Sequence, residues 1–359
     1  MNKRFLIASG GTGGHFYPGF AIGKALRKHG CAVLFIVRKN DPAAQILEAH
    51  HLHYREIDFT GLPRSMNPLR HLRFTGKFFK SLNQTRRIVR EFRQDMALGM
   101  AGYISFPLIF TAHLMGIKTA VHDSNACLGL ANRICGKFAD LFMLGLPLIT
   151  PRKGTVLTGT PIRQEFEEPA DRQKLLSGLG LDPALQTVLV VGGSQGAKNL
   201  NVAVAHLAKT NTRCQFIHIT GERWYTTVRE MHEGNPRVAV LPYSHEIYAL
   251  MKSVDAVICR SGASTLAEVI YCQLPALLVP FPHAAGNHQY YNAKILADAG
   301  CATLVEDNDQ LQGKLTTAFE TMSKGQKLAA MRLGYKHLNL PSPLTAAKQI
   351  ARLLTNFPD

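Results

Sequence analysis

The chain alternates short apolar runs with longer amphipathic stretches along its whole length. Runs of three to five mostly apolar residues, bounded by glycine or polar residues, occupy 5–8, 33–37, 96–100, 119–122, 141–144, 155–157, 188–191, 216–219, 238–241, 256–259, 276–279 and 302–305. Such runs are typical of buried parallel strands, and the stretches between them repeat apolar residues at helical spacing. The alternation predicts an α/β chain with a parallel sheet in each half.

The two halves meet where this periodicity stops. Between Gly159 and Gln173 the chain reads GTPIRQEFEEPADRQ, in which proline, glycine and a burst of charge mark a joint. Ligands of open parallel sheets bind beyond the carboxyl ends of the strands. We therefore expect two domains that face each other, with the functional site in the cleft between them.

Composition places this chain among intracellular globular proteins. Its 359 residues are 46% hydrophobic, enough for two cores of ordinary size, yet no stretch reaches the 18 apolar residues that a spanning helix requires. The first strand begins within five residues, so no signal peptide is expected. The seven cysteines are scattered and never spaced as C-x-x-C, which favours reduced thiols in a cytosol.

Charge is concentrated in the first half. Residues 1–165 contain 23 Lys and Arg against 9 Asp and Glu, a difference of +14, whereas residues 166–359 contain 18 against 16, a difference of +2. The stretch 60–90 is basic, has no acidic residue and is interleaved with Leu and Phe. Three interpretations remain open: a nucleic-acid patch, a surface that docks on anionic lipid, or an amphipathic helix with a solvated basic face.

A glycine-rich loop follows the first strand. The sequence ASGGTGGHFYPGF joins an apolar run to a helical pattern, and such a loop suits a phosphate because glycine allows close approach and the helix start offers free amides. The dinucleotide pattern fails because Phe16 stands where its third glycine belongs, and no Gly-Lys-Ser/Thr follows. A tight turn without a ligand remains the alternative.

The second half also contains a glycine-rich loop between a strand and a helix, and it adds clusters of polar residues. VLVVGGSQGAKN is again a strand, a glycine loop and a helix that can begin at Ser194, and ICRSGASTLAE places Glu268 in the first turns of a later helix. Glu268 either accepts hydrogen bonds from a ribose diol or stabilises its helix as a charge near the N-terminus. His283, Asn287, His288, Gln289 and Asn292 follow the next strand, and their side chains suit sugar hydroxyls.

These motifs together resemble glycosyltransferase family 28, and within it the bacterial transferases that make lipid II. The resemblance rests on GGTGGHFYPGFAIGKAL, GGSQGA, RSGASTLAE and HQYYNA, in this order across nearly the whole chain. It implies a GT-B fold of two Rossmann-like domains: residues 1–162 for the acceptor and membrane, with helix 342–359 packing back on them, and residues 163–341 for the donor. It implies inverting transfer of N-acetylglucosamine from UDP-N-acetylglucosamine to the 4-hydroxyl of the muramyl-pentapeptide of lipid I.

The resemblance also assigns donor-site residues by position. It implies that Ser194 and the amides around Gly262, Ala263, Ser264 and Thr265 contact the UDP phosphates. It also implies that Leu266 belongs to the donor site, that Glu268 holds the ribose, and that Gln289 with His288 holds the sugar. It implies that a backbone amide near Ser244 reads the uracil and that Arg163 reaches the nucleotide. Asn125 should lie near the transferred sugar, and Thr12, Gly13 and Gly14 belong to the loop that faces the cleft.

Inverting transfer needs a base for the acceptor hydroxyl and stabilisation of the departing UDP. His15 is the candidate base, because a helix N-terminus favours the neutral imidazole; binding of phosphate or sugar is its alternative role. Asp123 is a second candidate. We expect no cofactor and no obligatory metal, because the single Asp-x-Asp, at Asp307, reads as a helix cap.

The acceptor side carries both the basic stretch and the departures from the family pattern. The resemblance implies docking on an anionic membrane at the cytoplasmic face of the inner membrane, a peripheral location, through Arg70, Arg73, Phe74, Lys77, Phe78, Phe79, Lys80 and Tyr103. Cell-wall synthesis proteins are candidate partners, and no nucleic acid is expected. The second glycine loop reads AGYISFPLIF, where Ala101 replaces a glycine of the family and puts the loop geometry in question. A different GT-B transferase or a UDP-sugar epimerase would keep the donor motifs.

Overall fold

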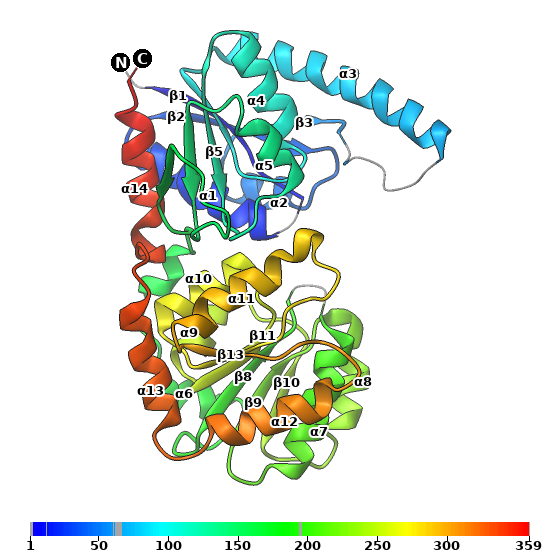
Figure 1. Cartoon of the computed structure of the whole chain (residues 1–359), viewed down its shortest axis with the longest axis vertical. Coiled ribbons are helices and arrows are strands. Elements are labelled where there is room, and N and C mark those ends of the chain that lie inside the picture. The colour runs from blue at the N-terminus through cyan, green and yellow to red at the C-terminus, as the bar shows by residue number, and fades with distance from the viewer. Residues whose placement is uncertain (1–2, 12, 60, 62–66, 194–195, 359) are drawn as a thin grey trace. The chain divides into compact units, whose positions relative to one another are not determined.

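The computed structural model describes residues 3–11, 13–59, 61, 67–193 and 196–358. The chain divides into two compact units, Met1–Arg163 with Leu340–Asp359, and Gln164–Asn339. Each unit is a parallel sheet with helices on its faces (Figure 1), which confirms the predicted fold class of two Rossmann-like sheets.

The first unit is built on a seven-stranded sheet among the described residues, in the order β3-β2-β1-β4-β5-β6-β7. Every neighbouring pair is parallel. The strands are β1 Arg4–Ala8, β2 Ala32–Arg38, β3 Tyr54–Ile57, β4 Met96–Gly99, β5 Lys118–Asp123, β6 Leu141–Leu144 and β7 Thr155–Leu157. The order reverses between β1 and β4, which opens a crevice at the carboxyl ends of these two strands.

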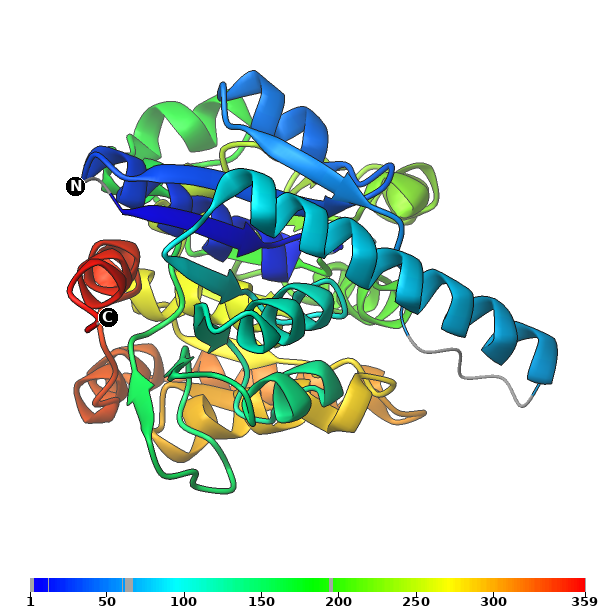
Figure 2. The same ribbon diagram turned by 90° about the horizontal axis from the view of Figure 1, so that it is seen from above.

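The helices of this unit are α1 Gly13–Lys28, α2 Ala43–Ala49, α3 Pro68–Phe92, α4 Ser105–Leu114, α5 Leu130–Cys135 and α14 Pro343–Thr355. Helix α3 is long, and Figure 2 shows its amino-terminal part extending beyond the sheet while its carboxyl-terminal part lies near α4. None of the helices in the described part of the chain is both long and apolar enough to cross a membrane.

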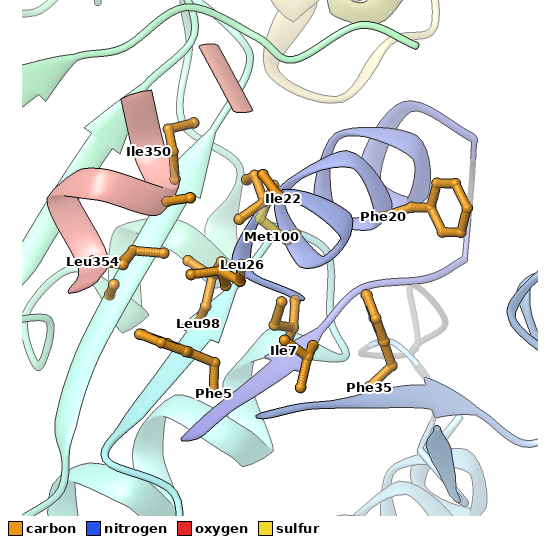
Figure 3. Close-up of a cluster of buried hydrophobic side chains, with 14 of the residues drawn as sticks. Phe5, Ile7, Phe20, Ile22, Leu26, Phe35, Leu98, Met100, Ile350 and Leu354 are labelled. Carbon is orange, nitrogen blue, oxygen red and sulfur yellow. The ribbon is translucent and has the colours of Figure 1, made fainter. Parts of the chain in front are cut away.

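Helix α14, at the end of the chain, belongs to the core of the first unit. It packs along α1, and its Ile350 and Leu354 are buried with Ile22 and Leu26 of α1 (Figure 3). Two fully buried aliphatic side chains stabilise such a contact by about 3 to 6 kcal/mol relative to exposure. The first unit is therefore formed by two stretches of chain that are far apart in sequence.

The second unit holds a six-stranded parallel sheet in its described residues, in the order β10-β9-β8-β11-β12-β13. Its strands are β8 Thr187–Val191, β9 Gln215–Ile219, β10 Val238–Leu241, β11 Ala256–Cys259, β12 Ala276–Leu278 and β13 Ala302–Leu304. Its helices are α6 Arg172–Gly178, α7 Lys198–Thr210, α8 Tyr225–Met231, α9 Ile247–Lys252, α10 Ala263–Cys272, α11 His288–Asp298, α12 Leu311–Met322 and α13 Lys327–Gly334. The order reverses between β8 and β11, so the crevice of this unit lies beside GGSQGA and RSGAST.

Short 3-10 turns complete the chain at Gln164–Glu167, Glu222–Trp224, Ala285–Asn287 and Tyr335–His337. One strand, β3, was not expected from the apolar runs. Its sequence YREI places two adjacent exposed charges, Arg55 and Glu56, in the middle of the strand, which an edge strand tolerates because one side of it faces solvent. Helix α7 begins at Lys198, four residues later than the earliest expected start.

Candidate active site

The loop between β1 and α1 lies at the crevice of the first unit. Gly11 has a φ of +90°, a conformation that disfavours residues with a Cβ. The Ser9 hydroxyl lies within hydrogen-bonding distance of the carbonyls of His15 and Phe16, at 3.0 and 3.2 Å, and so ties the loop to the first turn of α1. Because α1 begins at Gly13, the N–H groups of that first turn have no acceptor within the helix.

Gly19 brings α1 unusually close to the sheet. A Cβ added there would lie 2.4 Å from Ser9 Oγ and 2.8 Å from Met100 Cγ. The dinucleotide pattern has its close-packing glycine at position 16, where this chain has Phe16; here Gly19 takes that role. Sequence reasoning missed it because the pattern fixes a spacing that this loop does not share.

His15 and the second glycine loop come together. A Cβ added to Gly102 would lie 3.4 Å from the Cδ2 atom of His15, so the half-buried imidazole lies directly against this loop. Ala101 has a φ of +61° and Gly102 a φ of +73°. The loop therefore adopts a left-handed geometry in spite of the alanine, at a cost of about 1 to 2 kcal/mol. The Ser105 hydroxyl donates to the Ala101 carbonyl at 2.7 Å and helps to hold it.

Gly14 follows Gly13 in the first turn of α1, and both are exposed; Thr12 lies outside the described residues. Tyr103, on the second loop, is exposed, and its ring lies against Gly61. Gly13, Gly14 and Tyr103 are thus exposed residues of these two loops.

Asp123 ends β5 and is buried. Its Oδ1 accepts hydrogen bonds from the backbone N–H and the side-chain Nδ2 of Asn125, at 3.0 and 3.2 Å, and its Oδ2 accepts one from Asn132 at 3.1 Å. The carboxylate therefore anchors the turn that holds Asn125. This arrangement is better suited to orienting Asn125 than to collecting a proton.

Arg163 is the last residue of the first unit. Its guanidinium carbon lies 5.8 Å from the centre of the Tyr17 ring on α1, close to the turn that carries His15. The buried His122 donates from Nε2 to the carbonyl of Gly159 at 3.0 Å and fixes the start of the segment that leads to Arg163. Burial lowers the pKa of His122, which keeps the ring neutral.

In the second unit, α10 begins directly after the RSG loop that follows β11. Gly262 is its extended N-cap residue, and the amides of Ala263, Ser264 and Thr265 form the first turn, where the helix dipole favours an anion. Leu266 differs, because its N–H already donates to the Gly262 carbonyl at 2.9 Å and its side chain is fully buried.

Glu268 lies one turn further along α10 and is half-buried. Burial, and then the Glu268 carboxylate, raise the pKa of the Cys259 thiol to about 12. Glu268 lies on the helix that directly follows β11. The same two causes, in the same order, raise the pKa of Cys272 to about 12.

Gln289 is fixed by the end of the β11 strand and by its own loop. The fully buried Ser261 hydroxyl donates to the Gln289 carbonyl at 2.8 Å, and Gln289 Oε1 accepts the N–H of Phe281 at 2.9 Å. His288 Nδ1 lies 2.9 Å from the Ala285 carbonyl. Asn292, expected among the sugar contacts, is completely buried and donates to the Ser261 carbonyl at 3.1 Å, so it supports this loop from inside.

The Asp-x-Asp segment is not a helix cap, and that prediction is wrong. Helix α12 begins at Leu311 with Gln310 as its N-cap, and no side chain caps it. Asp307 instead forms an ion pair with Arg260, with 2.6 Å between Nη2 and Oδ2. Among the described residues, no group of three or more His, Cys, Asp or Glu is placed to hold a metal ion. Sequence reasoning quoted Arg260 without assigning it a role.

A buried histidine pair supports the GGSQGA loop of the second unit. His232 donates from Nε2 to His218 Nδ1 at 3.1 Å, and His218 donates from Nε2 to Asn201 Oδ1 at 3.1 Å. Asn201 donates in turn to the Thr220 carbonyl at 3.0 Å. A Cβ on Gly196 would lie 2.3 Å from that carbonyl oxygen, so only glycine fits there.

Ser194 lies outside the described residues. Ser244 follows β10, and its hydroxyl oxygen accepts the N–H of Glu246 at 3.2 Å in a turn. No pattern in the sequence marked the histidine pair, because its members come from β9 and from the residue after α8.

Helix α3 carries the basic face, and its Phe74 and Phe78 belong to a row of aromatic rings that continues onto α4. Lys77 and Lys80 each lie 3.3 Å from the Asp58 carboxylate, and their hydrogen bonds lower the pKa of Asp58. Phe79 is 64% exposed. The aromatic row runs through Phe59, Phe74, Phe78, Phe106, Phe110 and Phe138, with neighbouring ring centres 5.4 to 6.3 Å apart. The helix positions of Arg70 and Arg73 are described, but their side chains are not.

Two Rossmann-like sheets, each with a glycine loop at its crevice, define the GT-B class of nucleotide-sugar enzymes. The family model "Glycosyltransferase family 28 N-terminal domain" matches residues 5–143, and "Glycosyltransferase family 28 C-terminal domain" matches residues 187–339. The chain therefore belongs to glycosyltransferase family 28.

Two relatives that match along nearly their full length carry the same name, UDP-N-acetylglucosamine–N-acetylmuramyl-(pentapeptide) pyrophosphoryl-undecaprenol N-acetylglucosamine transferase. The protein of Elusimicrobium minutum is 50% identical over 354 residues, covering 97% of this chain and 98% of that protein. The protein of Desulforudis audaxviator is 35% identical, and the alignment covers 98% of each chain.

Solved structures agree with this family. The crystal structure of MurG from Acinetobacter baumannii matches with a TM-score of 0.81 and 25% identity, covering 99% of this chain and all of that one. A UDP-N-acetylglucosamine 2-epimerase matches with a TM-score of 0.66 at 12% identity, with 99% and 96% coverage, a likeness of fold alone.

Proposed function

We propose that this chain is an inverting glycosyltransferase that moves N-acetylglucosamine from UDP-N-acetylglucosamine to the 4-hydroxyl of the N-acetylmuramyl-pentapeptide of lipid I, producing lipid II and UDP. The observation that carries this proposal is 50% identity along 97% of the chain to a transferase named for this reaction. The polar groups at the crevice of each unit supply the chemistry that the reaction requires.

The second unit binds the donor in this proposal. The first-turn amides of α10 and the GGSQGA loop before α7 hold the diphosphate, since helix N-termini attract anions. Glu268 accepts hydrogen bonds from the ribose hydroxyls, and Gln289, beside His288, contacts the sugar. A backbone amide near Ser244 reads the uracil.

The first unit supplies the base. In the transfer, the acceptor 4-hydroxyl oxygen bonds to the anomeric carbon while the bond from that carbon to the UDP oxygen breaks. The proton of the hydroxyl passes to a base, and the electron pair leaves with UDP. We assign the base to His15, because its imidazole lies at the N-terminus of α1 against the second glycine loop. Asp123, which already accepts three hydrogen bonds, orients Asn125.

The acceptor diphosphate binds at the second glycine loop. Ala101 and Gly102 both have positive φ and form the turn that leads into α4, and the dipole of that helix start favours an anion. The left-handed Ala101 preserves this geometry in a loop that has lost its family glycine. Tyr103, exposed beside it, is the side chain we assign to the acceptor.

We further propose a peripheral location on the cytoplasmic face of the inner membrane. Exposed Phe79 and Leu72 on α3 insert into the interface, and the lysines and arginines of the helix attract anionic lipid. Cell-wall synthesis proteins are the further partners we expect at this surface.

The test is radiolabel transfer by the purified chain from UDP-N-acetylglucosamine to a lipid I analogue. We expect a labelled disaccharide product that forms only with both substrates present. Conversion of the UDP-sugar to an epimer without acceptor would instead support the second candidate, an epimerase, which the fold likeness raises. Absence of any reaction, together with salt-sensitive binding of RNA or DNA, would reject both in favour of a nucleic-acid-binding protein.

A further inference from the structure

Asp307 connects two segments that follow different strands of the second unit's sheet, the loop after β11 and the start of α7. Its Oδ2 accepts a hydrogen bond of 2.6 Å from Arg260 Nη2, and its Oδ1 accepts one of 2.9 Å from Asn199 Nδ2. Arg260 directly follows β11, and Asn199 is the second residue of α7. The Asp307 side chain is 2% exposed and the Arg260 side chain 11%, so little water competes for this pair.

Arg260 extends the connection to a third strand. Its Nη1 donates to the carbonyls of Val279 and Pro280, at 3.0 and 3.1 Å, just after β12. The next residue, Ser261, holds the Gln289 carbonyl at 2.8 Å. The Asp307 carboxylate therefore connects three segments and holds them at fixed positions relative to one another. They are the start of α7, the loop before α10 and the loop that leads to Gln289.

We infer that Asp307 is a positioning residue for the nucleotide-sugar site, an inference that rests on the proposed function. A phosphate held by two helix N-termini is bound well only when both starts are correctly spaced, because the N–H groups of both must reach it. Without the carboxylate, Arg260 keeps a buried charge that lacks its partner and must reorient. The β11–α10 loop and the Val279–Pro280 turn would move with it, and α7 would lose its link through Asn199.

The geometry distinguishes this role from the metal-binding role of an Asp-x-Asp pair. Both Asp307 oxygens are taken by nitrogen donors, one from Arg260 and one from Asn199. Asp309, the other acid of the segment, is exposed. The two acids therefore differ in role, and Asp309 serves as a matched control.

The experiment measures the KM for UDP-N-acetylglucosamine, kcat, and the Kd of UDP by calorimetry for four variants. We expect Asp307→Asn to raise KM and the Kd of UDP about tenfold with kcat within about threefold, since remote positioning contacts act on donor binding. Asn199→Ala, which removes the exposed half of the connection, should raise both about threefold. Asp309→Asn should match the unsubstituted chain.

Leu315→Ala controls for stability. Leu315 is completely buried on α12 and lies outside the connection, so its substitution lowers the Tm without changing KM or the Kd of UDP. If Asp307→Asn lowers the Tm but leaves both constants unchanged, as Leu315→Ala does, the positioning role is wrong. If the unsubstituted chain binds no UDP or UDP-sugar at all, the proposed function fails and this inference fails with it.

Discussion

The carboxylate of Asp41 holds the glycine loop of the first unit through Gly11. Its Oδ2 accepts the Gly11 N–H at 2.7 Å, and its Oδ1 accepts the N–H of Ala43 at 3.1 Å. A Cβ added to Gly10 would lie 3.0 Å from the same Oδ2 atom, so the loop passes closely over a buried acid. Asp41, which follows β2, therefore fixes the backbone of the loop that leads to His15.

Asp41→Ala should weaken both the fold and transfer. Two backbone donors lose their acceptor, which costs about 1 to 3 kcal/mol for each group left buried without a partner. We expect a lower free energy of unfolding in a denaturant titration and a reduced kcat, because the His15 turn loses its support. Asp41→Asn, which keeps one carbonyl oxygen, should retain more of both. Equal activity of Asp41→Ala and the unsubstituted chain would separate Asp41 from the site.

Glu268→Ala should remove recognition of the ribose. The unsubstituted chain should prefer UDP-N-acetylglucosamine over its 2′-deoxyribose analogue by about 10- to 150-fold in kcat/KM, since a lost charged hydrogen bond costs about 1.5 to 3 kcal/mol. The variant should use both donors equally poorly. A variant that keeps the preference would return Glu268 to the simpler role of a charge on its helix.

Gln289 requires a matched pair of variants, because its Oε1 already accepts the Phe281 N–H. Gln289→Ala removes both this internal bond and the side-chain donors, whereas Gln289→Glu keeps an acceptor oxygen, removes the donors and adds a negative charge. We expect both to raise the KM for the donor about tenfold, with Tm lowered chiefly in Gln289→Ala. If Gln289→Glu behaves as the unsubstituted chain does, the amide does not bind the sugar.

Membrane docking should depend on Lys77 and Lys80. Each basic side chain near an anionic surface is worth about 1 kcal/mol, so Lys77→Gln with Lys80→Gln should reduce partitioning into phosphatidylglycerol vesicles about 30-fold. Asp58→Asn, which releases both lysines from their ion pairs, should increase it.

The matched control is Lys314→Gln with Lys327→Gln, two exposed lysines of the second unit. It makes the same change in net charge and should leave cosedimentation with the vesicles unchanged. If both double variants lose the same affinity, binding reflects total charge and the docking proposal for α3 is wrong.

The buried histidine pair predicts loss of stability in acid. Burial, with His232 beside it, lowers the pKa of His218 to about 3, and burial, with Lys209, lowers that of His232 to about 4. The unfolded value is near 6.5, so the unfolded chain binds more protons between these limits. Stability is complete above pH 6.5 and falls as pH drops toward 4, by about 2 kcal/mol for each ring at pH 5.

Urea titrations between pH 7 and 4.5 measure the slope of the free energy of unfolding against pH. His232→Gln should reduce it by about one proton, whereas His206→Gln, at an exposed histidine, should not change it. A slope that is identical in all three chains would mean that other groups account for the acid sensitivity.

Sequence reasoning predicted the strands well where both faces are buried, because such strands are continuous apolar runs. It missed β3, whose Arg55 and Glu56 are exposed on an edge strand. It identified the glycine loops from composition and order, and it placed Gln289 and Glu268 after the correct strands.

The connections behind these loops could not be predicted, because they join residues far apart in sequence. Arg260 and Asp307 are 47 positions apart, and Asn199 and Asp307 are 108 apart. The pattern around Asp307 suggested a cap because local spacing cannot show which distant donor a carboxylate meets. Asn292 belongs to the polar cluster after β12, but it is buried. It lies on helix α11, and its side chain donates to the Ser261 carbonyl.

The central claim is that the second unit binds the nucleotide-sugar at the carboxyl ends of β8, β11 and β12. A crystal structure with UDP-N-acetylglucosamine tests it most directly. We predict the diphosphate at the first-turn amides of α10, the ribose at Glu268 and the sugar at Gln289. A donor found only against residues of the first unit would contradict the account.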